Sequence, residues 1–118
     1  MRSDGRAFDR GRCLVLADGF YEYTTPTNPK QKRKDRWLFQ HSGTAPYAIA
    51  GLLRDAPAVG EAFTLLTMPP GPDLAGYHDR QIALLPPAAW RPWLVGSAAA
   101  ASNLLRTLPA GSLRVTTA

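Results

Sequence analysis

The sequence predicts an α+β fold, with a mainly antiparallel β-sheet or barrel-like core and short helices late in the chain. Two observations favour it. Short apolar segments recur about every 10 to 16 residues before position 86, with turn-forming residues between them. The chain also holds 11 prolines and 10 glycines among 118 residues, which excludes long helical bundles. The length fits one small domain.

The expected strands lie between these turn-forming residues. The polar stretch 1–11 is expected to be an irregular lead-in, and Ala17-Asp18-Gly19 predicts a turn between the first two strands. The segment 20–24 alternates aromatic residues with others, as a half-buried strand does. Prolines and basic residues make 25–35 a loop. The strands are predicted at 12–16, 20–24, 36–40, 47–53, 63–67, 81–85 and 113–116.

The character of the chain changes after residue 85. Pro86-Pro87 begins a short helix over 88–94, since proline is favoured in the first helical turn. The alanine-rich segment 97–107 predicts a second helix, which ends before Pro109 and Gly111.

The composition excludes several classes of protein. A single cysteine cannot form an internal disulfide or a zinc site built on several cysteines, and it suits the reducing cytoplasm, where we expect the protein. No apolar run approaches the roughly 20 residues of a membrane span, so no membrane partner is expected. The charged start leads into no apolar signal segment. No phosphate-binding glycine loop and no metal-spaced histidine pair is present.

The net charge of +5 favours an anionic partner. Most of the excess lies in one run that includes Lys32, Arg33 and Lys34. This run is either a solvated loop or a contact for nucleic-acid phosphates, because clustered lysine and arginine gain affinity by releasing counterions.

Two segments and one thiol are candidates for chemistry. Glu22 lies between tyrosines, where lost solvation would raise its pKa and suit it to acid–base work; alternatively, it faces solvent between buried rings. His78-Asp79-Arg80 offers a proton shuttle beside an anion clamp, or a local hydrogen bond that fixes a loop. Cys13 lies in an apolar run, where a free cysteine usually behaves as a small hydrophobe.

Six segments occur in a distinctive order between residues 7 and 95. They are an arginine-rich lead into Arg-Cys-Leu, a Gly-Phe-Tyr-Glu-Tyr segment, an Ala-Gly-Leu strand, a strand ending in threonine, a His-Asp-Arg element and Leu-Pro-Pro followed by tryptophans. Together they resemble the SOS response-associated peptidase (SRAP) family, whose members shield abasic sites in single-stranded DNA.

The resemblance implies an enzyme that acts on abasic single-stranded DNA. An N-terminal cysteine, exposed by removal of the initiator methionine, would close a thiazolidine with the sugar aldehyde. On this resemblance Glu22 is the catalytic carboxylate and His78 the catalytic histidine, Arg80 contacts phosphate, and Thr67 lines the site. No metal or cofactor is implied. The peptidase of the family's name refers to self-removal of the leading residues.

The chain also departs from the family pattern. It begins Met1-Arg2, and the family's first part, which carries the nucleophile, has no counterpart. We therefore expect residues 1–118 to form a single, partial SRAP-like domain, truncated at its N-terminus and unable to form the thiazolidine crosslink. Cys13 cannot substitute, because the nitrogen of an internal cysteine is an amide. Gln81 stands where the family has methionine, so the preceding loop is expected to end differently.

Two other functions remain open at the level of sequence. One is a non-catalytic basic module that binds single-stranded nucleic acid, in which exposed members of the trio Trp37, Trp90 and Trp93 would stack on bases. The other is an inactive fragment.

Overall fold

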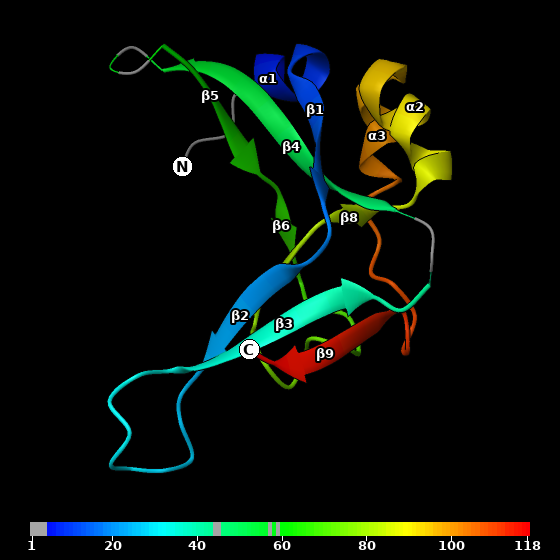
Figure 1. Cartoon of the computed structure of the whole chain (residues 1–118). Coiled ribbons are helices and arrows are strands. Elements are labelled where there is room, and N and C mark those ends of the chain that lie inside the picture. The colour runs from blue at the N-terminus through cyan, green and yellow to red at the C-terminus, as the bar shows by residue number, and fades with distance from the viewer. Residues whose placement is uncertain (1–4, 44–45, 57, 59) are drawn as a thin grey trace.

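The computed structural model describes residues 5–43, 46–56, 58 and 60–118. Helices gather at one end of the molecule, strands form the body, and the loop between β2 and β3 projects from the opposite end (Figure 1). The elements in chain order are α1 (Gly5–Arg10), β1 (Arg12–Ala17), β2 (Phe20–Thr24), β3 (Asp35–His41), β4 (Tyr47–Ala56), β5 (Gly60–Leu65), β6 (Thr67–Met68), β7 (Gln81–Ile82), β8 (Leu84–Leu85), α2 (Pro87–Val95), α3 (Ala98–Ser102) and β9 (Leu113–Thr117).

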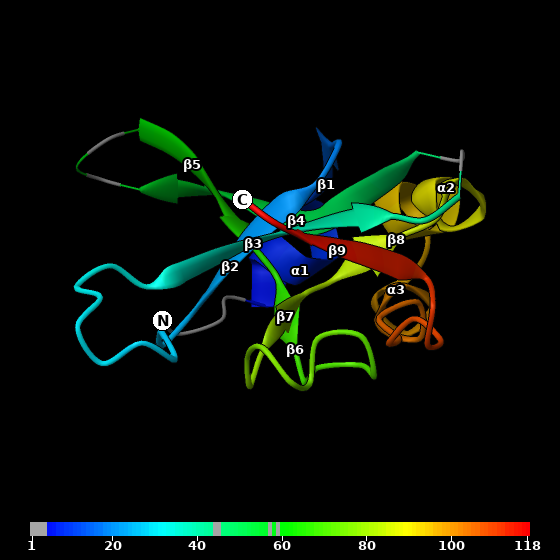
Figure 2. The same cartoon turned by 60° about the horizontal axis from the view of Figure 1, so that its bottom comes forward.

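All described strand pairs are antiparallel, which confirms the predicted fold class. One sheet has the order β1-β4-β5, with β8 also pairing with β4. A second has the order β2-β3-β9, so the last strand does lie at a sheet edge. The short pair β6-β7 forms a third sheet, which lies to one side of the other strands with its connecting loop outermost (Figure 2).

The chain passes from the first sheet to the second at Gly19. A Cβ atom at this position would lie 2.8 Å from the carbonyl oxygen of Phe39, closer than real Cβ contacts. Glycine therefore allows β2 to begin immediately beside β3.

The main core lies between the first sheet and the helices. Trp93 is fully buried, and its indole nitrogen donates to the carbonyl of Cys13 at 2.8 Å. Arg12 is almost buried as well, and its guanidinium donates to the backbone carbonyls of Phe8, Trp93 and Gly96. One cation thus satisfies carbonyls near the ends of two helices, where the backbone carries partial negative charge.

The predicted irregular lead-in over 1–11 is wrong for residues 5–10, which form α1. The ring of Phe8 packs edge-on against Trp93 at 5.7 Å, and Arg12 bonds to the carbonyl of Phe8. Tertiary contacts therefore hold a helix that its own sequence does not favour. Residues 1–4 lie outside the described part of the chain.

The predicted helix over 97–107 is too long. It begins with Ser97, whose side chain accepts from the amide of Ala100, but it ends at Ser102. Leu104 and Leu105 instead pack against the core cluster, which turns the chain back toward β9. The predicted strand 63–67 is also divided, because β5 ends at Leu65 and β6 begins at Thr67.

Within the described residues, no helix has both the length and the apolar character needed to cross a membrane.

Candidate functional site

Glu22 lies on the inner face of β2. Phe20, Glu22 and Thr24 are half-buried, whereas Tyr21 and Tyr23 are each 50% exposed. The alternative of a solvent-facing glutamate between buried rings is therefore wrong: the carboxyl points inward and the tyrosines point outward.

The inner face continues onto β3. Glu22 lies directly opposite Trp37, and Phe20 lies opposite Phe39 with the rings stacked at 5.4 Å. The indole nitrogen of Trp37 donates to the hydroxyl of Thr24 at 2.8 Å. The carboxyl of Glu22 is thus bordered by aromatic surface and by a polar pair that is already satisfied.

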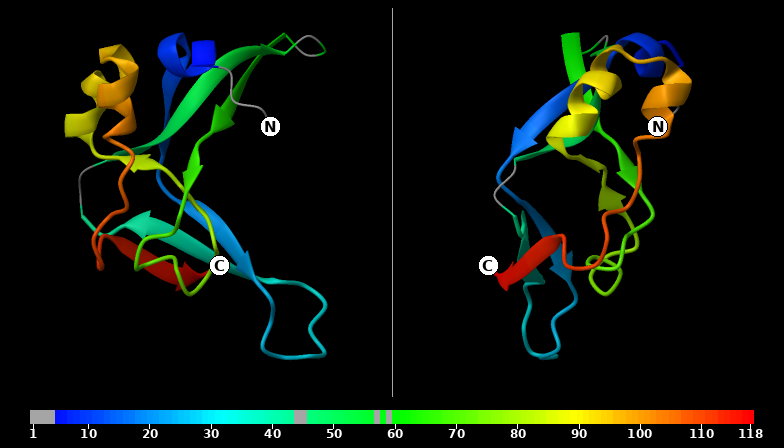
Figure 3. Two further views of the ribbon diagram at one scale, coloured as in Figure 1. Left: turned by 180° about the vertical axis from the view of Figure 1, so that it is seen from behind. Right: turned by 90° about the vertical axis from the view of Figure 1, so that its right-hand side faces the viewer.

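The loop between β6 and β7, residues 69–80, covers this inner face (Figure 3, left). The ring of Tyr77 meets Trp37 edge-on at 5.2 Å and Phe39 at 5.1 Å. Because Tyr77 immediately precedes His78, this aromatic packing brings the histidine to the side of the sheet that carries Glu22.

Three contacts anchor the loop. Leu74 is fully buried, and the carboxylate of Asp73 accepts from the amides of Gly111 and Leu113, just before and at the start of β9. The buried Gln81 accepts from the amide of Gly71 at 2.7 Å. Gln81 therefore closes the base of the loop through its side-chain amide.

His78 is held at one ring nitrogen. Its Nδ1 lies 3.1 Å from the amide nitrogen and 2.9 Å from the carbonyl oxygen of Arg80, and 3.4 Å from the carboxylate of Asp79. The His78 side chain is 43% exposed, and that of Asp79 is 94% exposed. The local hydrogen bond anticipated for this segment does exist, and it leaves Nε2 without a hydrogen bond to the described residues.

Burial raises the pKa of Glu22, and the positive charge of His78 acts in the opposite direction and lowers it. The two groups come from separate segments of the chain, Glu22 from β2 and His78 from the loop 69–80. The two candidate residues that the sequence singles out therefore lie on the same side of the β2-β3-β9 sheet.

Arg80 and Thr67, two further candidates, contact each other close to His78 in the chain. The guanidinium of Arg80 donates to the hydroxyl of Thr67 at 3.2 Å, and both side chains are exposed. Thr67 pairs with Ile82 across the β6-β7 ladder, which explains why Arg80 reaches it. We call Glu22, Thr67, His78 and Arg80 the site cluster.

Lys32, Arg33 and Lys34 do not join the site cluster. They line an open hollow together with Tyr23 and Arg36, which lie on the outer face of the sheet. A more enclosed cavity of about 240 Å³ lies elsewhere, where β2 and β3 meet β4, and the site cluster does not line it.

Cys13 lies opposite Gly51 in the β1-β4 ladder. A Cβ at Gly51 would lie 3.1 Å from its sulfur, so the thiol is packed against the neighbouring strand. Burial raises the pKa of the Cys13 thiol, which disfavours the thiolate. Cys13 is therefore a partly buried residue that packs against the neighbouring strand.

The tryptophans proposed for stacking on bases make contacts within the fold instead. Trp93 is fully buried, and Trp90 donates its indole hydrogen to the carbonyl of Leu85 at 2.8 Å. Sequence reasoning missed Trp37 and Tyr77 as supports of the site. Only their long-range contacts give them this role, so no local pattern could have found them. Among the described residues, no group of three or more His, Cys, Asp or Glu is placed to hold a metal.

The fold and this cluster define a small β-rich domain in which a loop carries a histidine onto the inner face of a three-stranded sheet. The model of the family "SOS response associated peptidase (SRAP)" matches residues 4–117. The chain therefore belongs to the SRAP family, which is associated with DNA damage.

Solved structures show the same fold. A protein from Bordetella bronchiseptica superposes with a TM-score of 0.79 at 25% identity, over 96% of this chain and 57% of that one. A phage-related protein from the same organism superposes with a TM-score of 0.66 at 29% identity, over 95% of this chain and 55% of that one. A protein from Bacteroides thetaiotaomicron superposes with a TM-score of 0.77 at 19% identity, over 95% of this chain and 51% of that one. This chain thus spans little more than half the length of each. No match was found among curated proteins.

Proposed function

We propose that the site cluster binds single-stranded DNA at an abasic site and that Glu22 and His78 transfer protons there. One observation carries this proposal: the packing of Tyr77 on Trp37 and Phe39 holds the loop that bears His78 over the sheet face that carries Glu22. A carboxyl and an imidazole that come from separate segments of the chain to one face of a sheet are typical of acid–base sites.

The proposed step is the opening of the abasic deoxyribose ring. The base takes the proton of the C1′ hydroxyl, the C1′–O4′ bond breaks, and the acid gives a proton to O4′. The products are a C1′ aldehyde and a 4′ hydroxyl, with no net change in atoms or charge. Any later attack by an amine requires this aldehyde. Glu22 and the unengaged Nε2 of His78 supply the base and the acid of this step.

Arg80 supplies the anion contact in this proposal. Its guanidinium is exposed. One N–H group donates to Thr67 and holds the guanidinium in place, while the other N–H groups can donate to a phosphate. The hydroxyl of Thr67 lies beside it and would line the same side of the sugar.

Cys13 is not the nucleophile in this proposal. Its nitrogen is an amide within β1, so it cannot close a thiazolidine, and its thiol is packed against Gly51. Covalent capture of the aldehyde, as the family resemblance implies for an N-terminal cysteine, is therefore assigned to no described residue.

The test uses a labelled single-stranded oligonucleotide with one abasic site. The wild-type chain should increase the rate at which a hydroxylamine probe traps the aldehyde. Glu22→Gln and His78→Ala should each lower that acceleration by about 100-fold or more, the range expected for one acid–base group. Their affinity for the oligonucleotide, measured by fluorescence anisotropy, should change little.

Glu61→Gln is the matched control, because it makes the same chemical change at the exposed start of β5. If it lowers the trapping rate as much as Glu22→Gln does, the site assignment is wrong. If no variant changes the trapping rate but the wild type binds the oligonucleotide, the chain is a binding module without catalysis.

A further inference from the structure

The outer face of the β2-β3-β9 sheet exposes two tyrosines. Tyr21 and Tyr23 are each 50% exposed, and strand alternation places them on the side opposite Glu22. The two half-exposed rings offer flat aromatic surface that the fold itself does not bury. No part of the site cluster uses these rings.

Positive charge surrounds the two rings. The guanidinium of Arg36 lies 4.8 Å from the centre of the Tyr21 ring, and Arg36 is also the cross-strand neighbour of Tyr23. The open hollow beside Tyr23 is lined by four basic side chains, Lys32, Arg33, Lys34 and Arg36, and by one acidic side chain.

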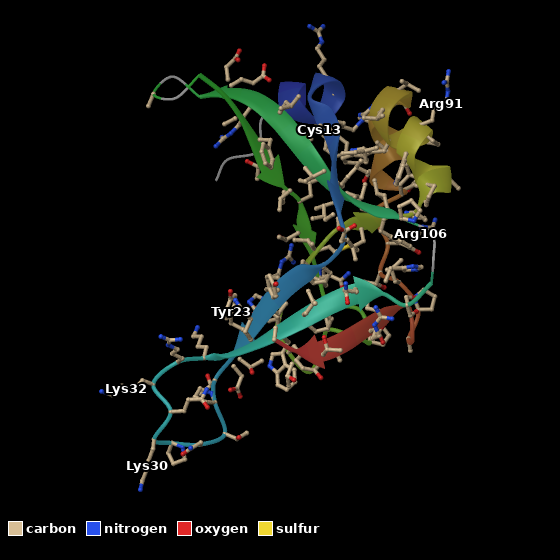
Figure 4. The ribbon with its side chains drawn as sticks, in the orientation of Figure 1. Cys13, Tyr23, Lys30, Lys32, Arg91 and Arg106 are labelled. Atoms are coloured by element: carbon tan, nitrogen blue, oxygen red, sulfur yellow. The ribbon has the colours of Figure 1, made fainter. Side chains whose placement is uncertain are left out.

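That acidic side chain is already engaged. The carboxylate of Asp35 accepts from the side-chain amide of Gln31 at 2.8 Å, so part of its capacity is used within the loop. The hollow therefore combines a net excess of cations with an aromatic wall. Tyr23 lies on the strand, and Lys30 and Lys32 extend from the loop below it (Figure 4).

We propose that this surface, formed by Tyr21, Tyr23, Lys32, Arg33, Lys34 and Arg36, is a second contact for single-stranded DNA. Unpaired bases stack on the tyrosine rings, and the backbone phosphates lie along the basic loop. Stacking accepts any base and needs bases that are not paired, which favours a single strand over a duplex. The choice of DNA over other polyanions rests on the proposed function.

The probe is labelled oligothymidine without abasic sites, titrated by fluorescence anisotropy at several salt concentrations. Replacing Tyr21 and Tyr23 together by serine should weaken binding by about tenfold or more, since stacking contributes about 1–3 kcal/mol per base. The salt dependence should not change. Replacing both by phenylalanine should preserve binding, which separates loss of the rings from loss of structure.

The charge variants test the second half of the proposal. Lys32→Gln with Lys34→Gln should make the slope of log K against log salt shallower by about 1.4, because each lost phosphate contact removes about 0.7 on a single strand. Arg91→Gln with Arg106→Gln removes the same amount of charge. Arg91 lies in α2 and Arg106 follows α3, both away from Tyr23 and Lys32 (Figure 4). This control should leave the slope unchanged.

Four results would overturn the proposal: no binding of oligothymidine, unchanged affinity in the serine variant, tighter binding of a duplex of equal length, or an equal change of slope in the control. Oligothymidine has no aldehyde, so these results do not depend on Glu22 or His78. If this surface does not bind DNA, accelerated aldehyde trapping at an abasic site is still expected. If Glu22 is not catalytic, the binding of oligothymidine to this surface is still expected.

Discussion

Glu22 and Trp37 lie directly opposite one another on β2 and β3, and the indole ring is in turn covered by Tyr77. The carboxyl is therefore placed by a ladder of backbone hydrogen bonds and the histidine by aromatic packing. Both placements depend on the same tryptophan.

Glu22 should make stability depend on pH in a defined direction. Burial raises its pKa above the usual value of 4.5, so the folded chain keeps this proton at a pH where the unfolded chain has lost it. Stability from this group is complete below 4.5 and falls as the pH rises through the raised pKa. The melting temperature of the wild type should therefore fall relative to Glu22→Gln over this range. An equal effect of Glu61→Gln would assign it to lost charge in general.

Arg12 should be a major contributor to stability. Arg12→Met leaves three buried or partly buried carbonyls without their cationic donor, and hydrogen bonds to charged groups contribute about 1.5–3 kcal/mol each. We expect a loss of at least about 3 kcal/mol in the free energy of unfolding, measured with urea. The same substitution at the exposed Arg91 should cost less than about 0.5 kcal/mol.

Gly19→Ala should destabilise the fold, because its Cβ would meet a backbone oxygen at 2.8 Å that cannot move without shifting β3. The expected cost is about 1–3 kcal/mol. Gly76→Ala is the control, since a Cβ there meets nothing within 4 Å. Thermal unfolding of both variants checks this, and equal melting temperatures would contradict it.

Asp73→Ala should loosen the loop that carries His78. The amides of Gly111 and Leu113 lose their acceptor, at a cost of about 1–3 kcal/mol. Hydrogen exchange at these two amides should become faster, and aldehyde trapping should slow while oligothymidine binding is retained. Unchanged exchange would show that the carboxylate does not hold the loop.

Cys13 should react slowly with thiol reagents. Its sulfur is packed against β4 and its pKa is raised, so little thiolate is available at neutral pH. Cys13→Ala should leave trapping at abasic sites unchanged. Reaction as fast as that of the unfolded chain would refute this assignment.

Most strands could be predicted from the sequence because they are short apolar segments with glycine or proline nearby. The predicted strands 63–67 and 81–85 are exceptions, since each is divided between two strands that pair with different partners. The direction in which β2 faces could not be predicted. Alternation over 20–24 is equally consistent with buried tyrosines, and only pairing with Trp37 and Phe39 makes Phe20 and Glu22 the inner set.

Local sequence signals predict one helix too long and miss another. Alanine propensity extends the predicted helix beyond Ser102, yet Leu104 and Leu105 gain more by packing on the core. Helix α1 has no recognisable local signal, and contacts of Phe8 and Arg12 with distant residues hold it. For the candidate site, the sequence identified the residue types, but the packing of Tyr77 on Trp37 and Phe39 joins distant segments and could not be predicted.

The anchoring of loop 69–80 at Leu74, Asp73 and Gln81 has a thermodynamic consequence. Ordering a free loop costs about 1–2 kcal/mol of conformational entropy per residue, and here that cost is met during folding. A ligand that reaches His78 should therefore meet a nearly rigid receptor. Its association should be fast, with no slow ordering phase after the encounter.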